Sequence, residues 1–311
     1  MTKRGSDAIV LDIGGTQIRV GHIRNDILST GFESYVSSSL CVPDAREKLL
    51  AIIDKYRHAH GLNLKAVVLG IPGVLDRTHD RISHCNNIPE LEGDGLLGFL
   101  SDKLDCSAFF EQDIMLQLLG EHRAGAAQKT ASVFGVYFGT GIGAAYLING
   151  DPDNSLVQDI QAGHIPIMAE GRLCKCGNTD CIEAYASGHT LTDLARRSGC
   201  PIDQLFARKT DVSRYPSLAQ ELDRFIVYQA YMLASICTMF TPQLLVIGGG
   251  IPMMSGYPRN TLIEKTISHL QSPYPAENIK FAWASLPTEA PLHGALALLD
   301  IKQNATHSTL S

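Results

Sequence analysis

The chain has 311 residues, of which 19% are charged, and its formal net charge at pH 7 is −6. This length allows one or two domains with an ample core, and the mildly acidic balance excludes a basic face for nucleic acid. No apolar run approaches the length of a membrane span, and the N-terminal MTKRGSDAIV lacks the apolar core of a signal peptide. We therefore expect a cytoplasmic protein without membrane or nucleic-acid partners. The eight cysteines are unevenly spaced, which does not fit a disulfide framework.

Apolar periodicity predicts an α/β pattern with hairpins and crossovers. In the first half we expect strands at 8–13, 19–23, 66–71 and 108–111, and helices at 46–58, 96–104 and 114–127. In the second half we expect strands at 131–138, 144–148, 244–247 and 279–284, and helices at 188–196, 217–220 onward, 224–240, 261–270 and 291–301. Asn149-Gly150 is a hairpin signal, and the polar tail from Gln303 is expected to fray.

Three of the expected strands run into glycine-rich turns. The motifs are DIGGT at 12–16, YFGTGIG at 137–143 and LLVIGGG at 244–250. Glycines let a backbone turn at positive φ and approach a ligand closely, and the exposed N–H groups with a Thr hydroxyl suit phosphate oxygens. Two such turns about one domain apart indicate two similar lobes that bind one nucleotide. The alternative is that all three are ordinary strand-ending turns of a doubly wound sheet.

A candidate metal site is formed by one histidine and a compact cysteine segment, CKCGNTDC at 174–181. Three thiolates and one imidazole are the ligands of a closed tetrahedral zinc site, which leaves no open coordination position. The expected ligands are His164, Cys174, Cys176 and Cys181. The metal is then structural, and its expected role is to fix His164 and Glu183 in place. The alternative is three reduced cysteines in a surface loop.

Asp113 lies between the expected strand at 108–111 and the expected helix at 114–127. One interpretation is a plain helix N-cap, for which Asp is favoured. The other is a general base, since phosphoryl transfer needs one carboxylate to accept the hydroxyl proton. The position between the two phosphate turns favours the base, and we expect the helix dipole to keep the carboxylate ionised. Asp12, inside the first turn, is expected to orient Mg²⁺ through water or to hold the turn.

Several motifs together resemble the ROK family of bacterial sugar kinases and sugar-responsive repressors, over nearly the whole chain. They are DIGGT, FEQD at 110–113, FGTGIG, AGHIP at 162–166, CKCGNTDCIEAYASG at 174–188 and IGGG at 247–250. The resemblance implies a two-lobed actin-like, hexokinase-like ATPase fold with ribonuclease H-like lobes and an interlobe cleft. It implies an N-terminal lobe at 1–117 that includes the C-terminal helix at 291–311, and a C-terminal lobe at 118–290.

The resemblance also assigns roles to individual residues. The two phosphate motifs and the adenosine motif of the wider group correspond to Asp12, Gly14, Gly15, Thr16, Gly139, Thr140, Gly141, Gly143, Gly248, Gly249 and Gly250. The family's sugar contacts correspond to Asn87, His164 and Glu183, and its catalytic Asp to Asp113.

Two expected sugar-site positions depart from the family pattern. Gln112 stands where the family usually has Asn, and Gln161 stands where it has Glu. The glycine-rich stretch before that position is also missing, and Asp159 is an alternative replacement for the lost carboxylate. The identity of the sugar is therefore left open.

The resemblance implies an ATP- and Mg²⁺-dependent hexose kinase that acts at O6, carries structural Zn²⁺ and forms a homodimer. The C-terminal part is most similar to D-allose kinases, and the alternatives are N-acetylmannosamine kinase, glucokinase or fructokinase. An alternative from a different functional class is a sugar-binding regulator that has lost catalytic activity. Because DIGGT begins at residue 12, we expect no helix-turn-helix domain before it, which favours the kinase. The cysteine segment disfavours a polymerising actin-like ATPase.

Overall fold

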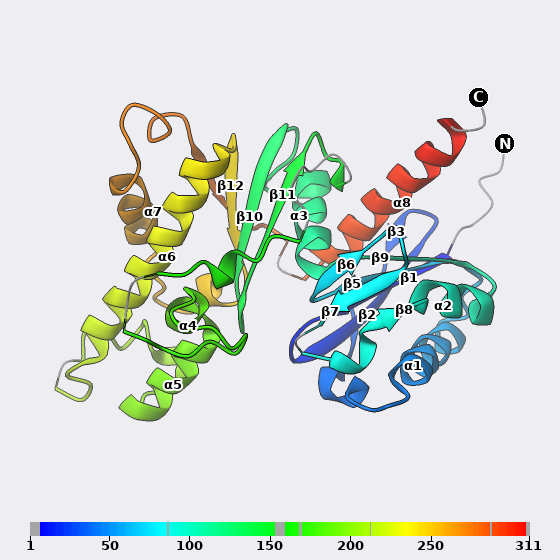
Figure 1. Ribbon diagram of the computed structural model, residues 1–311, viewed down its shortest axis with the longest axis horizontal. Coiled ribbons are helices and arrows are strands. Elements are labelled where there is room, and N and C mark those ends of the chain that lie inside the picture. The colour runs from blue at the N-terminus through cyan, green and yellow to red at the C-terminus, as the bar shows by residue number, and fades with distance from the viewer. Residues whose placement is uncertain are drawn as a thin grey trace. The chain divides into compact units, whose positions relative to one another are not determined.

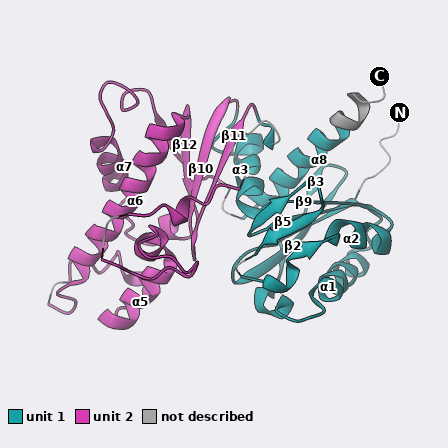
Figure 2. Ribbon diagram, viewed as in Figure 1, with its two compact units in different colours: residues 1–128, 150–152, 288–311 teal, residues 129–149, 153–287 magenta. Residues whose placement is uncertain are grey.

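The computed structural model describes residues 7–85, 87–152, 159–167, 170–211, 213–286 and 288–308. The chain divides into two compact units, shown in Figure 2: unit 1 is residues 1–128, 150–152 and 288–311, and unit 2 is residues 129–149 and 153–287. The first boundary falls after residue 128, so that helix α3 (Asp113–Ala124) lies whole in unit 1. No helix among these residues is long and apolar enough to cross a membrane.

Unit 1 is built on a six-stranded sheet in the order β3-β2-β1-β5-β9, with β4 beside β2. Its strands are β1 (Asp7–Ile13), β2 (Gln17–Arg24), β3 (Ile27–Leu28), β4 (Glu33–Val36), β5 (Leu64–Ile71) and β9 (Ser107–Gln112). β1 and β2 form an antiparallel hairpin, whereas β1, β5 and β9 run parallel. The carboxyl ends of these three parallel strands therefore meet at one edge of the sheet. Every residue of β1 is buried, as expected of a strand covered on both faces.

The remaining elements of unit 1 cover this sheet and extend it. They are α1 (Ala45–Ala59), α2 (Leu96–Leu104), α3, α8 (Ala290–Ser308), η1 (Ser37–Leu40), η2 (Pro89–Leu91), and a small antiparallel sheet of β6 (Val74–Asp76), β7 (Arg81–His84) and β8 (Gly93–Asp94). α3 and α8 lie side by side (Figure 1) because two glycines let their backbones touch. A Cβ on Gly120 would lie 2.1 Å from the Ala290 carbonyl oxygen, and one on Gly294 would lie 1.9 Å from that of Leu116.

Unit 2 is built on a four-stranded sheet in the order β11-β10-β12-β13. The strands are β10 (Ser132–Phe138), β11 (Ile142–Ile148), β12 (Leu244–Gly248) and β13 (Lys280–Trp283). β10 and β11 form an antiparallel hairpin, and β10, β12 and β13 run parallel. Each unit therefore contains a hairpin whose first strand starts a parallel set. The repeat of the glycine-turn motif along the sequence reflects this repeat of topology.

The helices of unit 2 are α4 (Glu183–Ala186), α5 (Gly188–Ser198), α6 (Leu218–Phe240) and α7 (Arg259–Ser268), with η4 (Ala162–His164), η5 (Ile202–Gln204) and η6 (Ile251–Met253). The two helices expected at 217–220 onward and 224–240 form the single helix α6. α6 buries an apolar face that includes Phe225, Leu233 and Ile236 in the core of unit 2. In unit 1, α8 continues to Ser308, beyond the expected end at 301.

Candidate active site and metal centre

Two carboxylates that we expected in the active site lie close together at one edge of the unit 1 sheet. Asp12, near the end of β1, is in register with Gly70 of β5, and Gly70 is in register with Glu111 of β9. Asp113 follows β9 directly as the first residue of α3. A Cβ on Gly70 would lie 3.3 Å from the Asp113 Cα, so glycine lets α3 begin close against β5. Asp12 and Asp113 therefore flank Gly70.

Asp12 is 2% exposed and lies within β1, one residue before its end, instead of inside the turn as expected. Its Oδ2 accepts a hydrogen bond from the Arg19 Nε at 2.8 Å and a second from a terminal nitrogen of Arg19. Its Oδ1 is buried and has no hydrogen-bond partner among the described residues. Burial raises the pKa of Asp12, and the Arg19 charge opposes that rise. A buried carboxylate oxygen that is left unpaired suits a hydrated Mg²⁺ as an oxygen ligand.

Asp113 is not the N-cap of α3, a position that belongs to Gln112. Its Oδ1 accepts the N–H of Ile114 at 2.8 Å. Burial raises the pKa of Asp113 to about 7, the charge of Asp12 adds to the rise, and the Ile114 N–H and Arg19 oppose it. The helix dipole was expected to keep this carboxylate ionised, but a pKa of about 7 leaves it partly protonated at neutral pH, because burial and a second carboxylate oppose the helix terminus. A pKa near 7 suits a general base working near neutral pH.

The first glycine turn is an exposed hairpin turn between β1 and β2. Gly15 and Thr16 are exposed, and the hydroxyl of the buried Ser37 donates to the Gly14 carbonyl at 2.7 Å. A Cβ on Gly15 would lie 3.1 Å from the Asn87 Nδ2. The turn expected to bind phosphate and a residue expected to bind sugar are thus neighbours within unit 1.

Gln112, expected in the sugar site, is 7% exposed, and its Nε2 donates to the Gly73 carbonyl at 2.8 Å. Its own N–H donates to the Glu111 Oε1 at 2.8 Å. Glu111 is 2% exposed and forms a two-pronged ion pair with Arg77, whose Nε lies 3.1 Å from Oε2. This network anchors the segment that leads into Asp113. Sequence reasoning missed the Arg77–Glu111 pair, which joins residues 34 positions apart.

In unit 2, the second glycine turn (139–141) joins β10 to β11, and the residues that follow the last cysteine pack on it. The N–H of Gly188 donates to the Gly139 carbonyl at 2.8 Å. The Glu183 Oε2 accepts the N–H of Ile142 at 2.8 Å. Glu183, expected to contact sugar, therefore also supports the backbone of the expected phosphate turn.

The other glycines of the two expected nucleotide motifs lie at the same edge of the unit 2 sheet, because β10 and β12 are parallel. Gly143 is within β11, opposite Tyr137 of β10. Gly248 ends β12, and a Cβ on it would lie 2.6 Å from the Tyr137 ring. Gly249 has a φ of +91°, which favours glycine, and the exposed Gly250 precedes η6.

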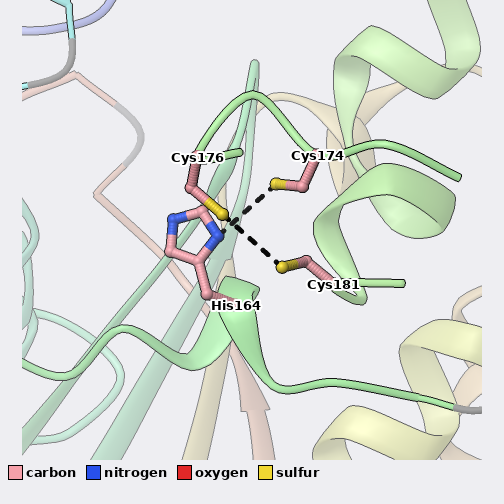
Figure 3. A group of neighbouring side chains, drawn as sticks. All are labelled: His164, Cys174, Cys176 and Cys181. Atoms are coloured by element: carbon pink, nitrogen blue, oxygen red, sulfur yellow. Dashed lines mark hydrogen bonds between the residues drawn. The ribbon is translucent and has the colours of Figure 1, made fainter. Parts of the chain in front are cut away.

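His164 and the three cysteines converge, as Figure 3 shows. Their ligand atoms all lie within 4.8 Å of one another. The Cys174 Sγ is 3.6 Å from the His164 Nδ1, and the Cys176 Sγ is 3.6 Å from the Cys181 Sγ. A tetrahedral zinc ion with Zn–S bonds near 2.3 Å sets its ligand atoms about 3.7 Å apart. The donor set and the spacing therefore fit zinc.

The cysteine segment is shaped by its own backbone. The Cys174 N–H donates to the Asn178 carbonyl at 2.7 Å, and the N–H of Gly177, at a φ of +93°, donates to the Cys174 carbonyl at 3.0 Å. Cys181 forms a β-bridge with Pro166, which brings it to the His164 segment. Burial raises the pKa of the Cys181 thiol to about 12. A thiolate at this position therefore needs a bound cation.

Gln161 lies directly before η4 (Ala162–His164) and is exposed. Its Nε2 is 3.5 Å from the Asp159 carbonyl oxygen. The stretch 153–158, on which most of the missing glycine-rich pattern falls, lies outside the described residues. Which of Gln161 and Asp159 replaces the family's glutamate therefore stays a prediction.

Comparisons with known proteins agree with this architecture. The ROK family profile matches residues 8–302. The glucokinase of Thermotoga maritima is 25% identical over 292 residues, which cover 84% of this chain and 87% of that protein. The N-acetyl-D-glucosamine kinase of Vibrio cholerae is 27% identical over 255 residues, which cover 77% and 83%. The ROK hexokinase of Thermus thermophilus matches with a TM-score of 0.76 at 27% identity, over 96% of this chain and 99% of that chain. The expected hexokinase-like α/β fold is thereby confirmed.

Proposed function

The chain belongs to the ROK family, and on that premise we propose that it transfers the γ-phosphoryl group of ATP to a hexose. The observation that carries the proposal is the pair of carboxylates at the sheet edge of unit 1. Asp113 has a pKa near 7 and lies close enough to Asp12 for the Asp12 charge to raise it. Asp12 stands two residues before the glycine turn at 14–16, and its Oδ1 is buried without a hydrogen-bond partner among the described residues. A base and a cation ligand beside a phosphate-binding turn are the elements that phosphoryl transfer requires.

In this mechanism Asp113 accepts the proton of the sugar hydroxyl as its oxygen attacks the γ-phosphorus. The bond between that phosphorus and the bridging oxygen breaks, and ADP leaves. Asp12 would hold Mg²⁺, which when bound neutralises charge on the phosphates. The turns at 14–16 and 139–141 hold phosphate oxygens through backbone N–H groups and the hydroxyls of Thr16 and Thr140. One of these turns belongs to each unit.

The same proposal gives the sugar contacts to Asn87, His164 and Glu183, with O6 as the acceptor. Zn²⁺ would be held by the cysteines and by the His164 Nδ1, which leaves the His164 Nε2 for the sugar. The zinc ion supplies no chemistry in this role and serves to fix its ligands. The expected homodimer and cytoplasmic location stay predictions.

The sugar itself is proposed on two grounds. The names of the relatives, glucokinase and N-acetyl-D-glucosamine kinase, support a hexose or an N-acetylhexosamine. The C-terminal resemblance to D-allose kinases and the amide at Gln161 favour D-allose over glucose. Gln offers one acceptor and two donors where Glu offers two charged acceptors, so it suits a different arrangement of hydroxyls.

A substrate panel tests this proposal. We would measure kcat/KM with ATP for D-allose, glucose, fructose, N-acetylglucosamine and N-acetylmannosamine, and locate the phosphate in the product by NMR. The proposal predicts phosphorylation at O6 of at least one of these sugars, with D-allose better than glucose. A strong preference for glucose would overturn the allose assignment and keep the kinase. Absence of turnover with every sugar would overturn the kinase.

A further inference from the structure

The Glu183 carboxylate fills a space between the second glycine turn and the segment that carries His164. Its Oε2 accepts the N–H of Ile142 at 2.8 Å. A Cβ on Gly141 would lie 2.6 Å from this oxygen, and a Cβ on Gly163 would lie 3.1 Å from it. Gly163 directly precedes His164. Two glycines thus provide the room for one carboxylate, and the carboxylate joins their two segments.

Backbone N–H groups of the chain that follows Glu183 donate to carbonyl groups of the turn at 139–141. The N–H of Gly188 donates to the Gly139 carbonyl at 2.8 Å, and the N–H of His189 donates to the Thr140 carbonyl at 3.3 Å. In a trans peptide the N–H points opposite to the C=O. The N–H groups of Thr140 and Gly141 are therefore directed away from the start of α5. Successive N–H groups held in this way favour an anion.

The residues just before Glu183 are joined to the segment that follows His164. Cys181 lies two residues before it and pairs with Pro166 across a β-bridge, and the Ile182 N–H donates to the Ile165 carbonyl at 2.9 Å. Any ion that holds His164 and Cys181 together would also hold the segment that carries Glu183 against the segment that carries Gly163 and His164.

We propose that Glu183 is a positioning residue that couples the metal centre to the turn at 139–141 and so sets the binding of the ATP phosphates. This inference rests on the proposed kinase function, which gives that turn to phosphate. It adds a second role for Glu183 beside the proposed sugar contact. It also accounts for Gly141, because a Cβ there would lie 2.6 Å from the Glu183 Oε2 and would force this carboxylate to shift.

A double-mutant cycle tests the contact. Gly141→Ala and Glu183→Ala are made singly and together, and the Kd of Mg-ATP is measured by calorimetry without sugar. We expect Gly141→Ala to weaken binding about tenfold when Glu183 is present and less than about threefold when residue 183 is Ala. Gly139→Ala is the matched control in the same turn, since its Cβ would meet only the Gly141 carbonyl oxygen, at 4.0 Å. Its effect should be the same in both backgrounds.

Amide exchange provides a second readout that needs neither ATP nor turnover. The Ile142 N–H should exchange about tenfold faster or more in Glu183→Ala and in chelator-treated wild type, because its acceptor is lost or displaced. Glu183→Gln keeps a carbonyl acceptor and should restore protection. Equal effects of Gly141→Ala in both backgrounds, or an Ile142 exchange rate that neither change alters, would overturn the proposal.

The two proposals fail in different ways. If Ile142 protection and the Gly141 coupling are found but no sugar is phosphorylated, the kinase assignment fails and the link between Glu183 and the turn stands. If sugar is phosphorylated and the coupling is absent, the kinase assignment stands and the positioning role of Glu183 fails.

Discussion

Replacing Asp113 by Asn tests two properties of this residue at the edge of the unit 1 sheet: its proposed role as a general base and its raised pKa. Asn has nearly the same shape and still offers an oxygen to the Ile114 N–H, which now lies 2.8 Å from the Asp113 Oδ1. It takes up no proton and carries no charge. Phosphoryl transfer should therefore slow by roughly 10²- to 10⁴-fold, the range for loss of a general base, while the Kd for sugar changes little.

The same substitution should stabilise the folded protein at alkaline pH. Burial, with the Asp12 charge, raises the pKa of Asp113 from 3.8 to about 7. The folded state thus binds this proton more tightly than the unfolded state, so wild-type stability falls as pH rises through this window and stays lower above it. The full shift corresponds to roughly 4 kcal/mol. Asp113 is partly exposed and water screens its charge. We therefore expect a gain of about 1–3 kcal/mol in the free energy of unfolding at pH 8.

Urea unfolding at pH 8 and pH 5 measures this gain, which should shrink at pH 5 because the wild-type carboxyl is then protonated in the folded state. Asp102→Asn, on an exposed part of α2 in the same unit, controls for the loss of one negative charge. It should show no such dependence on pH. If Asp113→Asn destabilises the protein at pH 8, or lowers kcat less than tenfold while KM rises steeply, Asp113 is a structural residue of α3 and the account of the base is wrong.

Three further predictions concern the base, the metal and the sugar. The pH profile of kcat/KM should fall on the acid side with an apparent pKa of about 7, since protonated Asp113 cannot accept a proton; a plateau down to pH 5 would argue against it. Elemental analysis should find about one zinc per chain, and Cys176→Ala should lose the metal together with sugar binding; fully active metal-free protein would dispose of the zinc assignment. Gln161→Glu should raise kcat/KM for glucose relative to D-allose by about tenfold to a hundredfold, the worth of a charge-assisted hydrogen bond; an unchanged ratio would remove Gln161 from the sugar site.

The elements with a clear apolar period could be read from the sequence. The helix Leu96–Leu104 has the expected bounds, and the expected hairpins around both glycine turns are present. The Cys/His cluster could be predicted from the sequence because three of its four residues lie within one short segment. By contrast, strands such as β3 and β8, of two residues each, are too short to show any period.

The electrostatics of the site could not be read from the sequence, because they depend on pairs that only the fold creates. Local sequence places Asp113 at a helix start, which predicts an ionised carboxylate. The fold, however, buries Asp113 and brings Asp12 close to it, and both effects raise the pKa of Asp113. The contact between Glu183 and Ile142 likewise joins residues 41 positions apart. Neither local sequence indicates that Glu183 and Ile142 contact each other.

The most direct test of the central claim is the transfer of labelled γ-phosphate from ATP to the hexose panel, followed by separation of the products. The account predicts that at least one hexose yields a labelled monophosphate, in an amount equal to the ADP formed. Label that appears only as inorganic phosphate, at a rate independent of the sugar, would contradict it.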